Sequence, residues 1–225
     1  MAKVIKCLSL IGLLVVLFFP VGSEAVTISA GDFITLNNSY GTTNGGEFIA
    51  TIKGSGNTFE TFCLEKNEFF RYGESLRVGS ITTSANKGGI GGGSPDPLSY
   101  ATAYLYNKFA TGQLSNYDYG DLNARVLDAN YLQNAIWYLE EEYTDKIAAF
   151  AALSDQAKKW LLEAEGANWN SYNGVAVLNL IRADGSLGQD QLAFDIDTAV
   201  PEPASLFLLG AGLMGVAIFA RRRKK

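Results

Sequence analysis

One change of hydrophobic period divides the middle of the chain into β-rich and helical parts. Residues 26–82 contain short alternating apolar runs such as "AVTISAGDFITL", "GEFIATIKG" and "NTFETFCLE", broken by Gly, Asn and Ser, which is typical of strands and turns. Residues 98–164 repeat apolar positions at helical spacing, and strand patterns return in "GVAVLNLI" and "QLAFDID". The predicted fold class is α+β: a β-rich sandwich or barrel-like part with a helical insertion and returning C-terminal strands.

The helical insertion is expected to hold about three helices. The first lies in "LSYATAYLYNKFATGQL", with Asp96 or Ser99 as its N-cap. The second runs through "YGDLNARVLDANYLQNAIWYLEEEY". The third covers "SDQAKKWLLEAEG", with Ser154 as its N-cap and Gly166 as its stop signal. The glycine-rich residues 84–97 lack the Lys-Ser/Thr ending of a phosphate-binding P-loop, so we interpret them as a flexible linker.

Both ends of the chain are apolar and carry basic residues. Residues 1–25 begin with a short basic region, continue through an apolar run and end in "SEA", so they are predicted to be a signal peptide. Residues 204–220 are 17 positions without a charge. At about 1.5 Å per residue, a helix of that length nearly crosses a hydrocarbon core of roughly 30 Å. The "RRRKK" that follows would stay cytoplasmic and leave the preceding domain outside. A permanent tail anchor is the simple interpretation of this end.

The C-terminal order is more specific than a plain anchor. Pro201-Glu202-Pro203, an apolar helix and a basic cluster follow one another, and residues 201–225 resemble the PEP-CTERM sorting signal of bacteria that carry an exosortase. The resemblance implies processing by signal peptidase and exosortase, with transient anchoring in the inner membrane. The mature protein is then expected at the cell surface or in the extracellular matrix of a Gram-negative-type bacterium. Residues 26–200 remain as the single folded domain.

This domain is acidic. The chain has 18 Lys and Arg and 23 Asp and Glu; the two end segments hold seven of the basic and two of the acidic residues, which leaves 11 basic against 21 acidic. Such a balance argues against nucleic acid or an anionic membrane surface as a partner. We therefore expect the protein to contact the membrane only through its C-terminal helix, before processing.

Cysteine and histidine are scarce. Cys7 leaves with the signal peptide, Cys63 is then alone, and the chain has no histidine. A Cys-His nucleophile and the commonest zinc ligand are thus missing, so we expect no enzymatic activity, no metal and no cofactor. Paired carboxylates in Glu140–Glu142 are the remaining hydrolase alternative, although such a run is usually a solvated helix end.

Cys63 has one candidate partner. Gln133 in "LQNAIWYLE" shares a helix face with Ala129, Ile136 and Trp137, so its amide points at apolar surface. Burying an unpartnered amide costs roughly 1–3 kcal/mol, so this side chain needs a hydrogen-bonding or covalent partner. From this helix alone, the favoured interpretation is an amide that is hydrogen-bonded to the backbone.

"FCLE" around Cys63, "LQNAIW" around Gln133 and the intervening "YATAYLYNKF" resemble the thioester domain of bacterial surface adhesins. The resemblance spans roughly residues 30–195. It implies that the Cys63 sulfur and the Gln133 acyl group form an internal thioester with loss of ammonia.

Neighbouring side chains are expected to form the pocket of this thioester. Phe62, Ile136 and Trp137 would exclude water, and Tyr131 and Trp137 would line the opening, although Trp137 fits a core role equally well. Glu65 could attract or activate an amine, but a solvated turn position is the favoured interpretation, because glutamate is rarely buried.

The sequence therefore predicts an adhesin-like covalent binding module, secreted or surface-associated. Its partner is expected to be an unknown extracellular ligand that bears an amine or a hydroxyl. The alternative is a structural protein of the extracellular matrix, associated with exopolysaccharide, in which Cys63 is a buried thiol.

Overall fold

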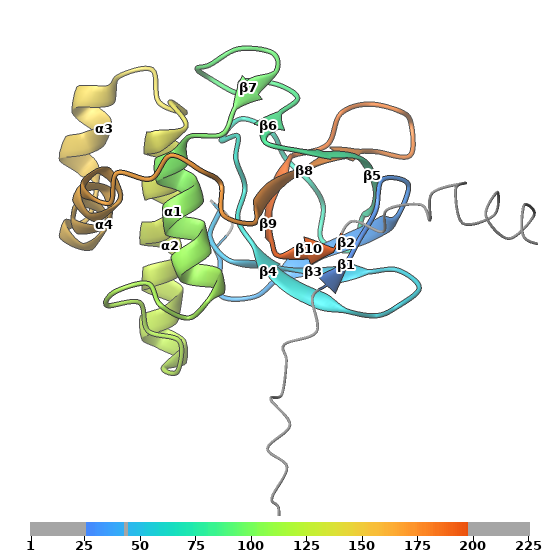
Figure 1. Cartoon of the computed structure of the whole chain (residues 1–225), viewed down its shortest axis with the longest axis horizontal. Coiled ribbons are helices and arrows are strands. Elements are labelled where there is room, and N and C mark those ends of the chain that lie inside the picture. Colours follow the sequence, from blue (N-terminus) through green and yellow to red (C-terminus); the bar gives the residue numbers. More distant parts are fainter. Residues whose placement is uncertain (1–25, 43–44, 198–225) are drawn as a thin grey trace, which may run out of the picture.

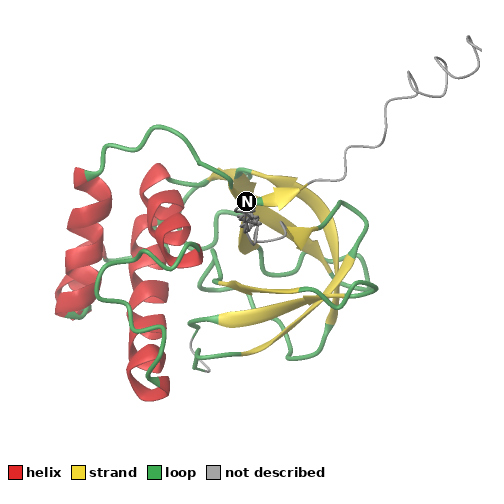
Figure 2. Cartoon of the chain, turned by 60° about the horizontal axis from the view of Figure 1, so that its bottom comes forward, coloured by secondary structure: helices red, strands yellow, loops and turns green. Residues whose placement is uncertain are grey.

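The computed structural model describes residues 26–42 and 45–197, which form a strongly curved sheet with helices packed against one side (Figures 1 and 2). The sheet is antiparallel and its strand order is β4-β3-β2-β5-β8-β9. The α+β class with a barrel-like sheet is confirmed. The strands are β2 (Phe33–Asn38), β3 (Phe48–Ile52), β4 (Thr58–Thr61), β5 (Ser75–Thr82), β8 (Val175–Ile181) and β9 (Gln191–Phe194).

The two edges of this sheet nearly close on each other. The N–H of Leu192 donates to the carbonyl of Phe62 at 3.1 Å, and the N–H of Leu64 donates to the carbonyl of Asp190 at 3.3 Å. Between them, Cys63 forms an isolated antiparallel bridge with Gln191. The residues that follow β4 thus form a seam with the start of β9, and Cys63 lies in that seam.

Four short strands form two further ladders. β1 (Val26–Thr27) pairs in parallel with β10 (Ile196–Asp197), so the two ends of the described chain meet. β6 (Ser84–Ala85) pairs with β7 (Asp96–Pro97). The glycine-rich segment between β6 and β7, which the sequence predicted as a flexible linker, is therefore a loop closed by its own ladder.

The helical layer contains α1 (Tyr100–Ala110), α2 (Leu122–Leu139), α3 (Lys146–Ala152) and α4 (Asp155–Gly166). The Ser99 side chain caps α1 by accepting from the N–H of Thr102, and the Ser154 side chain caps α4 in the same way. These caps and the end of α4 at Gly166 are confirmed. α2 is shorter than predicted because Asp121 caps its first turn. α3 was not predicted from the sequence.

Apolar side chains gather in two main cores. One fills the inside of the curved sheet, and the other lies between the sheet and the helices. A third, small cluster of Phe48, Cys63 and Trp137 joins the sheet to α2.

The acidic run at the end of α2 is not the solvated helix end that the sequence suggested. Glu140 and Glu142 are both buried, and only Glu141 is exposed. Glu140 accepts hydrogen bonds from the hydroxyl of Ser99 at 2.7 Å and from its N–H at 3.3 Å. Glu142 accepts from the N–H of Lys66 at 2.8 Å. Both carboxyl groups thus hold loops in place.

Candidate functional site

Cys63 lies in the seam with its thiol buried; the residue is only 2% exposed. Within the described chain it is the single cysteine and it forms no disulfide. The side-chain amide of Gln191, opposite it in the seam, donates to Sγ at 3.4 Å. Burial raises the pKa of the thiol, and the hydrogen bond from Gln191 opposes part of that rise. The thiol is therefore protonated at neutral pH.

Gln133 extends from α2 toward this seam and is equally buried. Its Nε2 donates to the carbonyl of Cys63 at 2.8 Å, and its Oε1 accepts from the N–H of Cys63 at 3.1 Å. The backbone of Cys63 therefore holds both ends of the Gln133 amide. The two residues of the predicted cross-link, 70 positions apart, are brought together.

A second backbone donor reaches the Gln133 carbonyl. The N–H of Gly46 donates to Oε1 at 3.4 Å, so this oxygen lies between two N–H groups. Paired backbone donors of this kind stabilise the oxyanion that forms when a nucleophile adds to a carbonyl. Gly46 was not predicted from the sequence, because a backbone donor leaves no side-chain pattern.

Gly45 forms the adjacent wall. Its φ is +108°, and a Cβ at this position would lie 2.5 Å from Cη2 of Trp137 and 2.8 Å from Cγ of Gln133. Both the backbone conformation and the close packing require glycine. The pair "GG" before "EF" was the only signal in the sequence.

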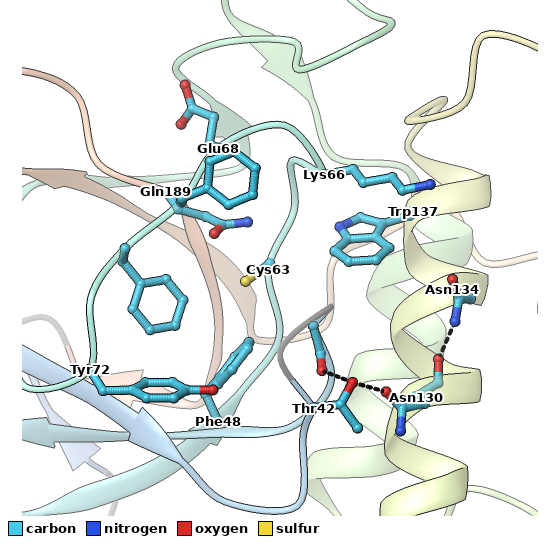
Figure 3. Close-up of a pocket in the computed structure, with 13 residues that line it drawn as sticks. Thr42, Phe48, Cys63, Lys66, Glu68, Tyr72, Asn130, Asn134, Trp137 and Gln189 are labelled. Atoms are coloured by element: carbon cyan, nitrogen blue, oxygen red, sulfur yellow. Dashed lines mark hydrogen bonds between the residues drawn. The ribbon is translucent and has the colours of Figure 1, made fainter.

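A cavity of about 690 Å³ opens beside Cys63 (Figure 3). Phe48, Phe70, Tyr72 and Trp137 supply aromatic walls, and the rings of Phe48 and Phe70 meet edge-on at 5.0 Å between centroids. Polar side chains complete the lining, among them Glu68, Asn130, Asn134 and Gln189.

Of the four expected pocket residues, Trp137 lines this cavity. Phe62 and Ile136 are fully buried in the core between sheet and helices, where Phe62 packs edge-on against Phe109 at 5.0 Å. Tyr131 is half-buried against the same core. Phe62, Tyr131 and Ile136 do not line the cavity.

Glu65 is not the solvated turn residue that the sequence favoured, because it is 2% exposed. Its Oε2 accepts from the N–H of Asp190 at 3.3 Å, while its Oε1 is buried with no partner among the described residues. Burial, together with the charges of Asp190 and Glu68, raises its pKa to about 9. At neutral pH the carboxyl is neutral, so Glu65 does not attract an ammonium group by charge.

No group of three or more His, Cys, Asp or Glu side chains within the described residues is arranged to hold a metal ion. The arrangement instead suits acyl chemistry. A protonated thiol and a carboxamide share one buried seam, the carboxamide oxygen faces two N–H donors, and a cavity opens beside the thiol.

The class of protein follows from the C-terminus. Residues 199–224 match the family model of the PEP-CTERM protein-sorting motif. The chain is therefore an exported protein that is sorted to the cell surface with processing by exosortase. No curated protein and no solved structure matches the chain.

The expected motif Pro201, Glu202 and Pro203 falls within the matched residues. This motif, the signal peptide at 1–25 and the apolar run at 204–220 all lie outside the described residues. Within the described part of the chain, no helix has both the length and the hydropathy that a membrane span requires.

Proposed function

We propose that this protein is a secreted or surface-associated covalent binding module. In it, Cys63 and Gln133 form an internal thioester that captures an extracellular nucleophile such as an amine. One observation carries the proposal: the backbone of Cys63 binds both ends of the Gln133 amide, and the carbonyl oxygen lies between the N–H groups of Cys63 and Gly46. Hydrogen bonds to the backbone would also satisfy an amide with a purely structural role. Such an amide would not require the residue that supplies two of these hydrogen bonds to carry a thiol.

Formation of the thioester is balanced without a cofactor. The Cys63 sulfur adds to the carbonyl carbon of Gln133, and the two N–H donors stabilise the oxyanion. The carbon–nitrogen bond then breaks, the thiol proton goes to Nε2, and ammonia leaves. The hydrogen bond from Gln191 to Sγ stabilises negative charge on the sulfur during addition.

Capture reverses the roles of sulfur and nitrogen. An amine adds to the acyl carbon of Gln133, the carbon–sulfur bond breaks, and the amine proton returns to the Cys63 sulfur. The product is an amide bond that persists without turnover. Burial of Cys63 and Gln133 restricts water, while the cavity lined by Trp137 admits the nucleophile.

The competing proposal is a structural matrix protein in which Cys63 stays a buried thiol. The burial of this thiol and its hydrogen bond from Gln191 support it. The two proposals differ in reactivity, because a buried thiol beside an intact amide does not react with amines.

Incubation of the mature protein with methylamine distinguishes the covalent binding module from the structural matrix protein. We expect one methylamine to be added at Gln133, and the Cys63 thiol to become available to iodoacetamide after denaturation only in treated protein. Cys63→Ala and Gln133→Ala should add no methylamine, whereas Gln113→Ala, at an exposed glutamine, should behave as wild type. Native protein with an intact Gln133 amide and no adduct would support the matrix protein.

A further inference from the structure

The cavity beside Cys63 is built for a more specific acceptor than a simple alkylamine. We propose, on the basis of the proposed thioester, that the captured molecule is an amino sugar with a free amino group. Three features of the cavity carry this inference: its lack of a base, its mixed walls and an unpaired indole N–H.

The cavity offers no side chain that would deprotonate an alkylammonium. Besides Cys63, its titratable side chains are Lys66, Glu68 and Tyr72. Glu68 pairs with Lys87 at 2.9 Å, so its carboxylate is already engaged. Burial raises the pKa of Tyr72, so its phenol stays neutral.

Burial lowers the pKa of Lys66, but its position does not suit a base for an amine beside Cys63. Its Nζ lies 3.8 Å from the centroid of the Tyr143 ring, and Figure 3 shows its side chain running past Trp137, away from Cys63. The chain contains no histidine. An acceptor amine must therefore arrive in its neutral form.

This requirement discriminates between amines. A lysine side chain with an ordinary pKa of about 10.4 has roughly one neutral amine in 2,500 at pH 7. In a 2-amino sugar, the neighbouring oxygens withdraw electron density from the nitrogen and make it less basic. A much larger fraction of that amine is neutral at the same pH and ready to attack the acyl carbon of Gln133.

The walls suit a sugar ring better than an alkyl chain. A volume of about 690 Å³ far exceeds what one alkylamine fills. Aromatic rings of Phe48, Tyr72 and Trp137 face the same space as the amides of Asn130 and Asn134. Apolar ring faces next to hydrogen-bonding groups match a pyranose, which has apolar C–H faces and a rim of hydroxyls.

Trp137 adds a specific donor. Its Nε1–H is buried and has no hydrogen-bond partner among the described residues, and an unpaired buried donor is unfavourable. The Lys66 side chain packs over the same indole, with Nζ 5.8 Å from the ring centroid. In this proposal the N–H donates to an oxygen of the captured sugar.

Intact mass spectrometry of the mature protein tests the inference. Separate incubations at pH 7 with glucosamine, N-acetylglucosamine, Nα-acetyl-lysine and methylamine should give the fastest addition with glucosamine, and none with N-acetylglucosamine. Trp137→Phe keeps an aromatic ring without the N–H. It should lower the glucosamine-to-methylamine rate ratio roughly three- to tenfold, the effect of one lost hydrogen bond. Trp169→Phe, at a half-buried indole that does not line the cavity, is the matched control.

The outcomes are distinct. Faster addition of Nα-acetyl-lysine than of glucosamine overturns the inference in favour of a protein acceptor, and the proposed function stands. An unchanged rate ratio in Trp137→Phe overturns the role of the indole N–H and with it the sugar-specific site. Failure of every amine to add, with an intact Gln133 amide, overturns the proposed function itself.

Discussion

Glu65 shows how burial changes what a side chain can do. Its position two residues after Cys63 places the carboxyl inside the seam rather than in solvent, because the segment after β4 is covered by the residues before β9. The cost of burying a charge keeps the carboxyl protonated.

A pH dependence of stability follows for Glu65. Its pKa is raised from 4.5 to about 9 in the folded protein, so between these values the folded state holds a proton that the unfolded state has lost. Stability should therefore fall as pH rises from about 5 to 9. Glu65→Gln, which mimics the neutral acid, should flatten this fall in thermal unfolding scans. Glu141→Gln, at an exposed carboxylate, should leave the fall in stability unchanged. A fall in Glu65→Gln as steep as that of the wild type would contradict the account.

Gly45, beside Gln133, is a second residue on which the site depends. Gly45 and Gly54 have nearly the same positive φ, +108° and +105°, but only a Cβ at Gly45 would collide with Trp137 and Gln133. Gly45→Ala should therefore displace the Gln133 amide and prevent thioester formation. Gly54→Ala carries the same backbone strain without the collision, so it should lose some stability and keep the thioester. The measurement is the methylamine-reactive fraction of each variant; equal fractions would contradict the packing argument.

The residues of the site were predictable only where a side chain carries the information. Cys63 stood out as a lone thiol and Gln133 as an amide on an apolar helix face, and the pairing of the two was predicted from the resemblance of their motifs to a thioester domain. Gly46 acts through its N–H, and Gln191 lies opposite Cys63 only because of the register between two segments 128 residues apart. No local pattern encodes that register, so neither residue was predicted.

At the scale of elements, Glu140 links the end of α2 to the start of α1. It accepts from the hydroxyl and the N–H of Ser99, the residue that also caps α1. Glu140→Ala should remove these bonds and leave the cap unsupported, at a cost of roughly 1–3 kcal/mol. Urea unfolding gives the measurement, with Glu141→Ala as the exposed neighbour. A loss no greater than that of Glu141→Ala would show that the contact does not stabilise the fold.

The helices and strands show what hydrophobic periodicity predicts and what it misses. Alternating runs located the long strands, and Ser99 and Ser154 located two helix starts, because both signals are local. α3 was missed because its seven residues include the exposed Ile147 and Phe150, so it has no clear apolar face. The acidic run after α2 was misinterpreted because its burial depends on loops that arrive from residues 66, 90 and 99.

At the scale of the whole molecule, the sequence predicted the class and a barrel-like sheet, but not the closure of that sheet. The edge segments after β4 and before β9 meet across more than 120 residues, and this long-range contact creates the seam that holds Cys63. The fold therefore builds the site: the barrel supplies the cysteine, and the helical layer supplies the glutamine.

The ends of the chain give a prediction for the mature protein. Because "SEA" precedes residue 26 and the PEP-CTERM motif covers residues 199–224, we expect cleavage between Ala25 and Val26 and loss of the basic C-terminus. Terminal peptide mapping of surface-localised protein checks both. Recovery of the "RRRKK" ending would indicate a plain membrane anchor.

The central claim is the covalent bond between Cys63 and Gln133, and intact mass tests it most directly. Untreated mature protein, purified in parallel with Cys63→Ala and Gln133→Ala, should be lighter than its sequence mass by one ammonia. Both variants should show their full sequence masses. Because they are processed at the same termini as the wild type, they provide the reference masses for the comparison. A wild-type protein at full sequence mass, with a cysteine that is freely alkylated once the fresh protein is denatured, would contradict the account.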